Sequence, residues 1–172
     1  MDASIVITVI CDDRPGVVGS LSDVLARHGG SWEESSMLSM AGQFAGILLA
    51  RLPGEGLDAC VAELEALGEK GLQIVVKRSG GAPEAADTRS FSLELVGQDR
   101  PGIVRDITRV LAAHGINVQE FETHCQSASM SGETLFFANA KLGVPTDVGV
   151  ERLQDELEDL ANELMVEIRF EE

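Results

Sequence analysis

A tetrapeptide of four unlike residues, Asp-Arg-Pro-Gly, occurs twice in this chain of 172 residues, at 13–16 and again at 99–102. Each copy lies within a longer repeat, because 9–35 and 95–121 align without a gap and are identical at 11 of 27 positions. Similarity over this length means that one structural unit is built twice along the chain. The fold is therefore predicted to consist of two similar small units instead of one larger domain.

The stretch between the repeats has the composition of a linker. Residues 79–89 read SGGAPEAADTR, in which Gly, Ala, Pro and polar residues leave no apolar face to bury. A linker at this place predicts three segments: a first unit at 1–78, the linker itself at 79–89, and a second unit at 90–172.

Within each unit, the spacing of apolar residues predicts alternating strands and helices. In 90–97 the apolar residues occupy every second position, which is typical of a half-buried strand. After each tetrapeptide, apolar residues recur at helical spacing. The proline is expected in the first helical turn, and Gly29 and Gly115 are expected to end the helices. His28 and His114 are expected to cap and pack at those ends.

Two strands, a second amphipathic helix and a last strand follow in both units. The strands are expected at 31–40 and 43–52 in the first unit and at 117–127 and 133–141 in the second, where Thr146 is expected to cap the helix. The resulting order, βαββαβ, packs as an antiparallel sheet with both helices on one face. Each unit is therefore predicted to have an α+β, ferredoxin-like fold.

The first strand of the first unit differs from its counterpart because both of its faces are apolar. Ile5, Ile7 and Val9 alternate as a buried face should, but Val6 and Ile10 are apolar on the other face as well. We therefore expect something to cover the outer face of the first sheet.

Charge and cysteine content bear on the class of function. With 13 Lys and Arg against 29 Asp and Glu, the chain has a net charge of −16 and no basic cluster, which disfavours direct binding to DNA or RNA. No apolar run approaches the roughly 20 residues that cross a membrane, and the acidic start disfavours a signal peptide. Cys11, Cys60 and Cys125 are widely spaced, so buried, reduced thiols in a cytoplasmic protein are expected.

Much of the negative charge lies in one segment, 147–172, which contains ten acidic residues and two arginines. Two explanations stay open: a solvated helix face, and a docking surface for a basic protein partner. Neither involves catalysis, and the sequence contains no nucleophile–base motif, GxSxG or Walker sequence. We therefore expect no enzymatic activity, no cofactor and no metal site.

The repeated tetrapeptide is the strongest candidate for a functional site. It joins a strand to a helix, and the first N–H groups of a helix have no partner within the helix, so they bind anions. The backbones of Gly16 and Val17, and of Gly102 and Ile103 in the second unit, are therefore predicted to bind a carboxylate. The aspartate of each tetrapeptide could accept from an ammonium group, and a site for both charges suits a free amino acid. A strand–helix turn without any ligand, in which the aspartate bonds the local backbone, is the alternative.

A strand, DRPG, a helix ending in HG and, in the second copy, INV together form a pattern that resembles the ACT domain, a regulatory module that senses small molecules. Two such units in tandem, with no enzyme attached, are similar to the glycine cleavage system transcriptional repressor family. This resemblance implies a non-enzymatic regulator that responds to glycine or a similar small amino acid. It also implies action through a regulatory protein partner, without direct contact to nucleic acid or membrane.

The resemblance further implies where the ligand binds. In ligand-binding ACT pairs, the contacts come from the strand–helix corner and from the polar residue that begins the second strand across the interface between units. The implied ligand-binding residues are Asp13, Gly16, Val17, Ser31, Asp99, Gly102, Ile103 and Asn117. The second unit, with Asn117, matches the family's pattern better than the first, with Ser31.

Two other functions are compatible with the sequence. The chain could be a ligand-free protein-interaction module with purely structural corners, or a detached regulatory subunit of an amino-acid metabolic enzyme. A homodimer is compatible with all of these functions. Pairing of the exposed second strands, edge to edge, is expected to protect them.

Overall fold

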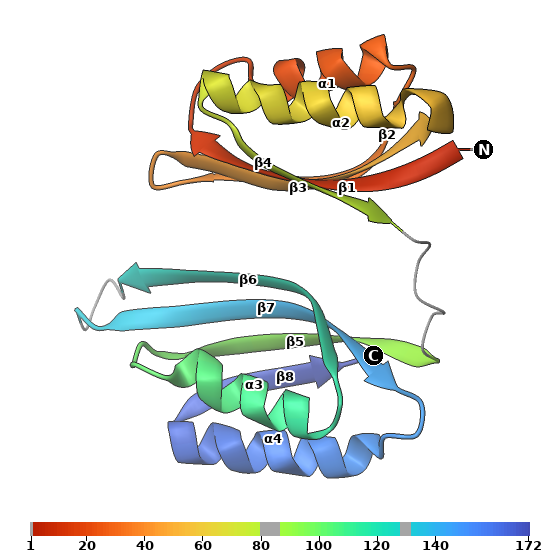
Figure 1. Ribbon diagram of the computed structural model, residues 1–172. Helices are drawn as coiled ribbons and strands as arrows, with labels where there is room; N and C mark the ends of the chain where they lie inside the picture. Colours follow the sequence, from red (N-terminus) through yellow and green to blue (C-terminus); the bar gives the residue numbers. More distant parts are fainter. Residues whose placement is uncertain (1, 80–86, 128–131) are drawn as a thin grey trace. The chain divides into compact units, whose positions relative to one another are not determined.

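The computed structural model describes residues 2–79, 87–127 and 132–172, and the chain divides into two compact units, Met1–Pro83 and Glu84–Glu172. Each unit consists of a four-stranded antiparallel sheet with two helices on one face (Figure 1). Both units therefore have the predicted α+β, ferredoxin-like fold, with their elements in the order βαββαβ.

The first unit is built from four strands, two α-helices and two short 3-10 turns. In chain order these are β1 (Asp2–Asp12), α1 (Val17–Arg27), β2 (Ser31–Met40), β3 (Gln43–Pro53), η1 (Gly54–Gly56), α2 (Leu57–Ala66), η2 (Leu67–Lys70) and β4 (Gln73–Ser79). The order of strands in the sheet is β2-β3-β1-β4, and all neighbours are antiparallel. The second strand along the chain, β2, therefore lies at an edge of the sheet.

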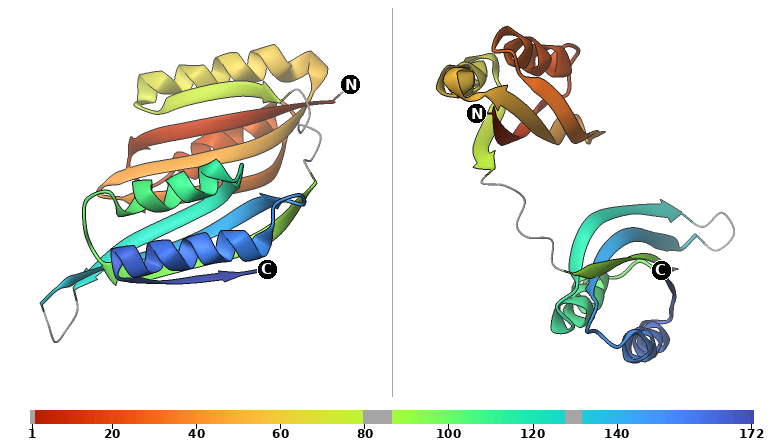
Figure 2. Two further views of the ribbon diagram at one scale, coloured as in Figure 1. Left: turned by 90° about the horizontal axis from the view of Figure 1, so that it is seen from below. Right: turned by 90° about the vertical axis from the view of Figure 1, so that its right-hand side faces the viewer.

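The second unit repeats this architecture with a longer second helix. Its elements are β5 (Thr88–Gln98), α3 (Ile103–Ala113), β6 (Asn117–Ser127), β7 (Thr134–Pro145), α4 (Val150–Leu164) and β8 (Val166–Glu171). The order of strands is β6-β7-β5-β8, so β6 takes the edge position that β2 has in the first unit. Figure 2 shows, for each unit, the two helices side by side on the same face of the sheet.

Each unit has its own core between the sheet and the helices. In the first unit, β1 contributes Ile5, Ile7 and Val9, which are almost completely buried, and α1 contributes Leu21 and Leu25. The second core is built in the same way from the corresponding elements. Alternation along strands and the 3.6-residue period along helices therefore predicted the buried faces correctly.

The start of the first helix in each unit differs from the expectation. Pro15 and Pro101 precede the helices instead of lying in their first turns, and α1 and α3 begin after Gly16 and Gly102, each with φ of +93°. Glycine adopts this left-handed conformation at little cost, and it turns the chain sharply from strand to helix. At the other end, Gly29 has a φ of +68° and ends α1 as predicted.

Three further expectations are wrong. Thr146 does not cap α4, which begins after Gly149 without a side-chain cap, and the Thr146 N–H instead donates to the Asp87 carbonyl. β7 runs on to Pro145, because its last residues continue the ladder with the first residues of β5. Cys125 is exposed, because it lies on an edge strand.

The segment predicted as a linker, 79–89, contributes to strands at both of its ends. β4 continues to Ser79 and β5 begins at Thr88. The division between the two compact units falls after Pro83, inside the same segment. Residues 80–86 lie outside the described part of the chain.

Candidate ligand-binding corner

The corner of the first unit lies where β1 ends and α1 begins. Asp13 is held to the neighbouring hairpin, since its N–H donates to the Gly42 carbonyl over 2.9 Å and its carboxylate accepts from the Ser39 hydroxyl. Its side chain does not cap α1, which begins without a side-chain cap. In the part of the chain that the structure describes, the N–H groups of Gly16 and Val17 hydrogen-bond to no acceptor.

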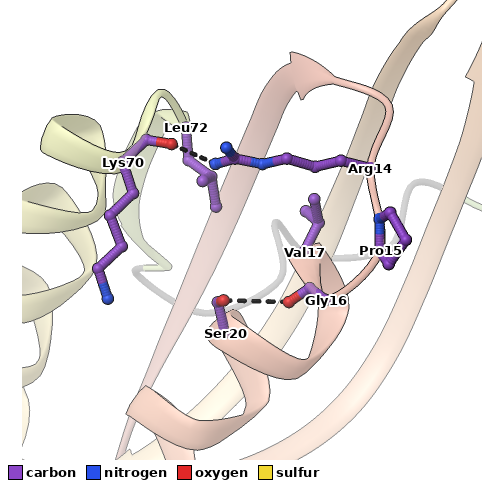
Figure 3. Close-up of a pocket in the computed structure, with 7 residues that line it drawn as sticks. All are labelled: Arg14, Pro15, Gly16, Val17, Ser20, Lys70 and Leu72. Carbon is purple, nitrogen blue, oxygen red and sulfur yellow. Dashed lines mark hydrogen bonds between the residues drawn. The ribbon is translucent and has the colours of Figure 1, made fainter.

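A cleft of about 470 Å³ opens beside this corner (Figure 3). Residues from the corner, from the first turn of α1 and from η2 and the segment after it line the cleft: Arg14, Pro15, Gly16, Val17, Ser20, Lys70 and Leu72. The Arg14 guanidinium reaches across and donates to the carbonyl of Lys70. The Ser20 hydroxyl donates to the Gly16 carbonyl over 3.0 Å, which keeps this hydroxyl at the start of the helix.

The cleft carries positive charge in a chain whose net charge is −16. Two of its lining residues, Arg14 and Lys70, are cationic, and none of the lining residues is acidic. The partial positive charge of the helix start adds to theirs. A carboxylate group would therefore find both hydrogen-bond donors and a favourable potential in this cleft.

The corner of the second unit has the same backbone but is closed by side chains. Arg105 donates two hydrogen bonds to Asp106, of 3.0 and 2.9 Å, and Arg100 donates a third, of 3.0 Å. The hydrogen bonds from Arg105, followed by that from Arg100, lower the pKa of Asp106. The Arg105 guanidinium lies so close to Gly102 that a Cβ at this position would be 3.0 Å from its Nη2. The Ile103 N–H donates to the Arg100 carbonyl over 3.4 Å, so this donor is also engaged.

Two positions account for the difference between the corners. In the alignment of the repeats, Gly19 and Ser20 occupy the places of Arg105 and Asp106. Glycine and serine are too short to reach over the corner, and nothing lies within 4 Å of where a Cβ would stand at Gly16 or Gly19. The first corner is therefore open, whereas the second is filled by the protein's own ion pairs.

The polar residues that begin the second strands lie far from the corners of their own units. Ser31 pairs with Arg51 and, through it, with Ser4 near the start of β1, whereas the corner follows Asp12 at the end of β1. Eight residues of strand, about 27 Å, separate the two positions. Asn117 has the matching place in the second sheet. Within each unit, the predicted contacts therefore fall into two separate groups.

Sequence reasoning did not single out Arg14, Ser20 or Lys70 as lining the open cleft. Arg14 belongs to the repeated tetrapeptide, so its charge was an available signal. Lys70 lies 56 residues further along the chain, in the turn that follows α2. Its approach depends on how α2 packs beside α1, which no local pattern encodes.

Both histidines at the helix ends join the two helices of their unit. His28 Nε2 lies 2.7 Å from the Glu63 carboxylate on α2, and His114 Nε2 lies 2.8 Å from the Glu156 carboxylate on α4. These hydrogen bonds are the main cause of a lowered pKa in both glutamates. The side chains therefore connect elements, which goes beyond the expected capping and packing.

A second cleft, of about 500 Å³, lies between α3 and α4. None of the predicted ligand-binding residues lines it. Among the described residues, no group of three metal-ligating side chains occurs that could hold an ion. No helix in the described ranges is long and apolar enough to cross a membrane.

Two ferredoxin-like units in tandem, each with a glycine-turned corner between its first strand and first helix, define a class of small duplicated α+β modules. Family models for the ACT domain match residues 3–77 and 91–162. The chain therefore belongs to the ACT-domain family and contains two ACT domains in tandem.

Known relatives of the chain include regulatory proteins. The glycine cleavage system transcriptional repressor of Escherichia coli (strain K12) is 26% identical over 125 residues, which are 72% of this chain and 66%, just under two thirds, of that protein. A crystal structure of an unknown protein from Galdieria sulphuraria is 30% identical, with a TM-score of 0.84 over 99% of this chain and 98% of that one. A crystal structure assigned to a glycine cleavage system transcriptional repressor is 19% identical, with a TM-score of 0.69 over 99% and 96% of the two chains, which supports the fold alone. The chain is an ACT-domain protein that is related to the glycine cleavage system transcriptional repressors.

Proposed function

We propose that this chain is a non-enzymatic regulator that binds a small amino acid, glycine or one of similar size, and transmits this binding to a regulatory protein partner. The observation that carries the proposal is the open, cationic corner of the first unit. Two free backbone N–H groups, at Gly16 and Val17, and the charges of Arg14 and Lys70 suit the ligand's carboxylate. The relationship to a repressor of glycine cleavage supports an amino acid as the ligand.

The remaining contacts of the proposed site are those implied by the sequence. The full set of proposed ligand-binding residues is Asp13, Gly16, Val17, Ser31, Asp99, Gly102, Ile103 and Asn117. Within this set we assign the ligand's carboxylate to Gly16 and Val17, because Arg105 and Asp106 close the corner of the second unit. This assignment reverses the ranking of the two units that Asn117 favours in the sequence.

Calorimetric titration of the full chain with glycine, serine and a branched amino acid tests the ligand. Glycine has five heavy atoms, so its binding free energy is limited to about −7 kcal/mol and its dissociation constant is micromolar or weaker. We expect saturable heat with at least one of the three. No binding of any of them at millimolar concentration would contradict the amino-acid part of the proposal.

A pair of substitutions tests the position of the site. Gly19→Arg combined with Ser20→Asp places the closing pair of the second corner into the first. We expect binding to weaken about tenfold or more, because the new guanidinium would cover Gly16 as Arg105 covers Gly102. Nothing lies within 4 Å of a Cβ at Gly19, so the fold should tolerate the change.

The matched control for this variant is Arg105→Gly combined with Asp106→Ser, which removes the closing pair from the second corner. It leaves the first corner untouched, so binding should persist. If the Gly19→Arg, Ser20→Asp variant kept full affinity, the ligand would lie elsewhere. Far-UV circular dichroism of both variants would show whether the fold is intact.

The second candidate function is a ligand-free protein-interaction module, and an observation on α4 favours it. Asp155, Glu158 and Asp159 are exposed on this helix and take part in no ion pair with any residue that the structure describes. Unpaired carboxylates in a row suit a basic protein partner. A detached regulatory subunit of an enzyme would differ from this module only in the identity of that partner.

Substitution of Asp155, Glu158 and Asp159 by their amides separates the two functions. If the partner docks on α4, these changes should reduce its capture and leave the titration with amino acids unchanged. Glu156 is kept, because its carboxylate accepts from His114 and Arg152 and its loss would disturb the helix pair.

A further inference from the structure

The outer face of the first sheet, on the side away from the helices, exposes large apolar side chains from all four strands. Paired residues of antiparallel strands point to the same side of a sheet. Ile47 and Val75 are the partners of Thr8 on its two neighbouring strands, so these three residues form one row. This row alternates along the strands with the buried rows that face the core. Of the nine large apolar side chains that are exposed in the described chain, five lie on this face: Ile10, Leu38, Met40, Ile47 and Val75. Burial of such a patch against another surface would be strongly favourable.

The second unit shows that the fold itself does not require this composition. In its sheet, the row that matches Ile47 and Val75 consists of Glu94, Asn139 and Arg169. Glu94 and Arg169 are exposed and form an ion pair of 3.9 Å. In this row one copy of the unit has solvated polar side chains and the other has exposed apolar ones, so the fold by itself does not explain the apolar residues.

Two opposite charges stand at the two edges of this apolar face. Glu34 on β2 lies opposite Leu49 on β3, Leu49 lies opposite Val6 on β1, and Val6 lies opposite Lys77 on β4. The four side chains therefore form one row across the sheet, acidic at one edge and basic at the other. Glu34 and Lys77 belong to no ion pair among the residues described.

This layout of charge is complementary to itself. When two such faces are related by a twofold axis that runs along the strands between β3 and β1, β2 of one copy lies over β4 of the other. Glu34 of each copy then faces Lys77 of its partner, and the apolar centres face each other. Sheets that pack face to face keep their strands within about 30° of each other, which this axis allows.

We propose that the outer face of the first sheet pairs with the same face of a second copy of this chain. Four strands about 4.8 Å apart and seven paired residues about 3.3 Å apart give a flat face of about 440 Å² per copy. Two copies together cover about 900 Å², which is below the roughly 1,200–2,000 Å² of stable interfaces and typical of weak, transient ones. The dimer is therefore a reversible one that forms with rising concentration. It does not depend on the proposed amino-acid site.

Sedimentation velocity of the full chain, from about 1 µM to about 1 mM, tests the dimer. We expect the sedimentation coefficient to rise from that of a monomer to that of a dimer over this range. Ile47→Lys puts a charge into the centre of the face and should keep the chain monomeric throughout. Asn139→Lys, at the matching position of the second sheet, makes the same change in net charge and should leave the dimer intact.

Exchange of the two edge charges tests the orientation of the copies. Glu34→Lys alone and Lys77→Glu alone place like charges opposite each other and should weaken the dimer about tenfold. The double variant Glu34→Lys, Lys77→Glu restores opposite charges with an unchanged net charge, so it should restore the dimer. A double variant as weak as the single ones would contradict the twofold arrangement.

A chain that stays monomeric at every concentration would overturn the proposal. Hydrogen exchange of β1 and β3 in that monomer would then tell the other occupants apart. If exchange is slow and Ile47→Lys makes it fast, another part of the same chain covers this face. If Ile47→Lys leaves the exchange rate unchanged, the face is uncovered in the monomer and available to a different protein. A dimer that Ile47→Lys and Asn139→Lys weaken equally would also contradict the proposed pairing of the first sheets.

Discussion

A single glycine in each tetrapeptide decides how the chain turns from strand to helix. Gly16 and Gly102 have the same φ, +93°, and a residue with a Cβ would strain the backbone there. The motif is therefore repeated for a conformational reason that holds with or without a ligand. What differs between the corners is the pair of residues three and four positions later, which is Gly19 and Ser20 in one unit and Arg105 and Asp106 in the other.

Gly16→Ala should lower the free energy of unfolding by about 1–2 kcal/mol, because alanine adopts positive φ at this cost. Nothing lies within 4 Å of the added Cβ, so the loss would be conformational and not steric. Gly19→Ala, in the helix and equally unhindered, should raise the free energy of unfolding by about 0.5–1 kcal/mol. Urea denaturation monitored by circular dichroism measures both, and a stable Gly16→Ala variant would argue against the strain.

In each unit, one contact between side chains of different elements keeps the two helices together. A histidine at the end of the first helix hydrogen-bonds to a glutamate near the middle of the second, in both units. Glu63 also accepts from Arg27, and Glu156 also accepts from Arg152. Such a tie occurs in both units and holds each helix pair in register over the sheet.

These ties predict how stability depends on pH. The hydrogen bonds from the histidines lower the pKa of Glu63 and Glu156 in the folded state below the ordinary value of 4.5. A carboxylate whose pKa falls on folding contributes stability above its unfolded pKa, and this contribution is lost as the pH falls through the folded pKa. Glu63→Gln and Glu156→Gln should therefore destabilise the protein near pH 7 and much less at pH 3.

Thermal unfolding at the two pH values measures this difference. Glu158→Gln serves as the control, because Glu158 lies on α4 and joins no ion pair in the described structure. Its effect should be small at both pH values. An equal loss of stability at pH 7 and pH 3 for Glu63→Gln would mean that the charge of the carboxylate is not what matters.

At the scale of the whole molecule, the two copies of one fold differ at two surfaces that bear on binding. One corner is open and cationic while the other is closed by Arg105 and Asp106, and one sheet face is apolar while the other carries Glu94 and Arg169. Both differences concern surfaces, and the cores remain alike. The duplication therefore supplied two scaffolds, of which the first unit presents the corner and the face that we propose as binding surfaces.

The excess of acidic residues predicts a response to salt that belongs to the whole chain. A net charge of −16 destabilises the compact state by self-repulsion, and salt screens it, with a screening length of about 10 Å at 0.1 M and about 3 Å at 1 M. The melting temperature should therefore rise between about 0.01 M and about 0.5 M NaCl. The measurement is made at low protein concentration, so that self-association does not contribute to the melting temperature. A falling melting temperature would mean that surface ion pairs outweigh the repulsion.

Much of the fold was predictable because its causes are local or repeated. The alternation in β5 and the helical period after each tetrapeptide follow from burial of one face, and the repeat turned one unit into two. The helix starts were not predictable in detail, since Pro15 could have stood inside or before the helix, and only the φ of Gly16 shows which. Thr146 was a reasonable cap by composition, but α4 begins only after Gly149, so the Thr146 side chain lies too far before the first turn to cap it.

The amino-acid sequence by itself determined the duplication, the α+β class, both buried faces and the corner as the place to look for a site. These properties depend on spacing along the chain, which the sequence displays directly. Only the tertiary structure decided that Lys70 comes to lie beside Arg14, that Arg105 covers Gly102, and that exposed apolar residues of four strands share one face of the sheet. Each of these depends on residues distant in the chain meeting in space, and that is set by packing, which no local pattern contains.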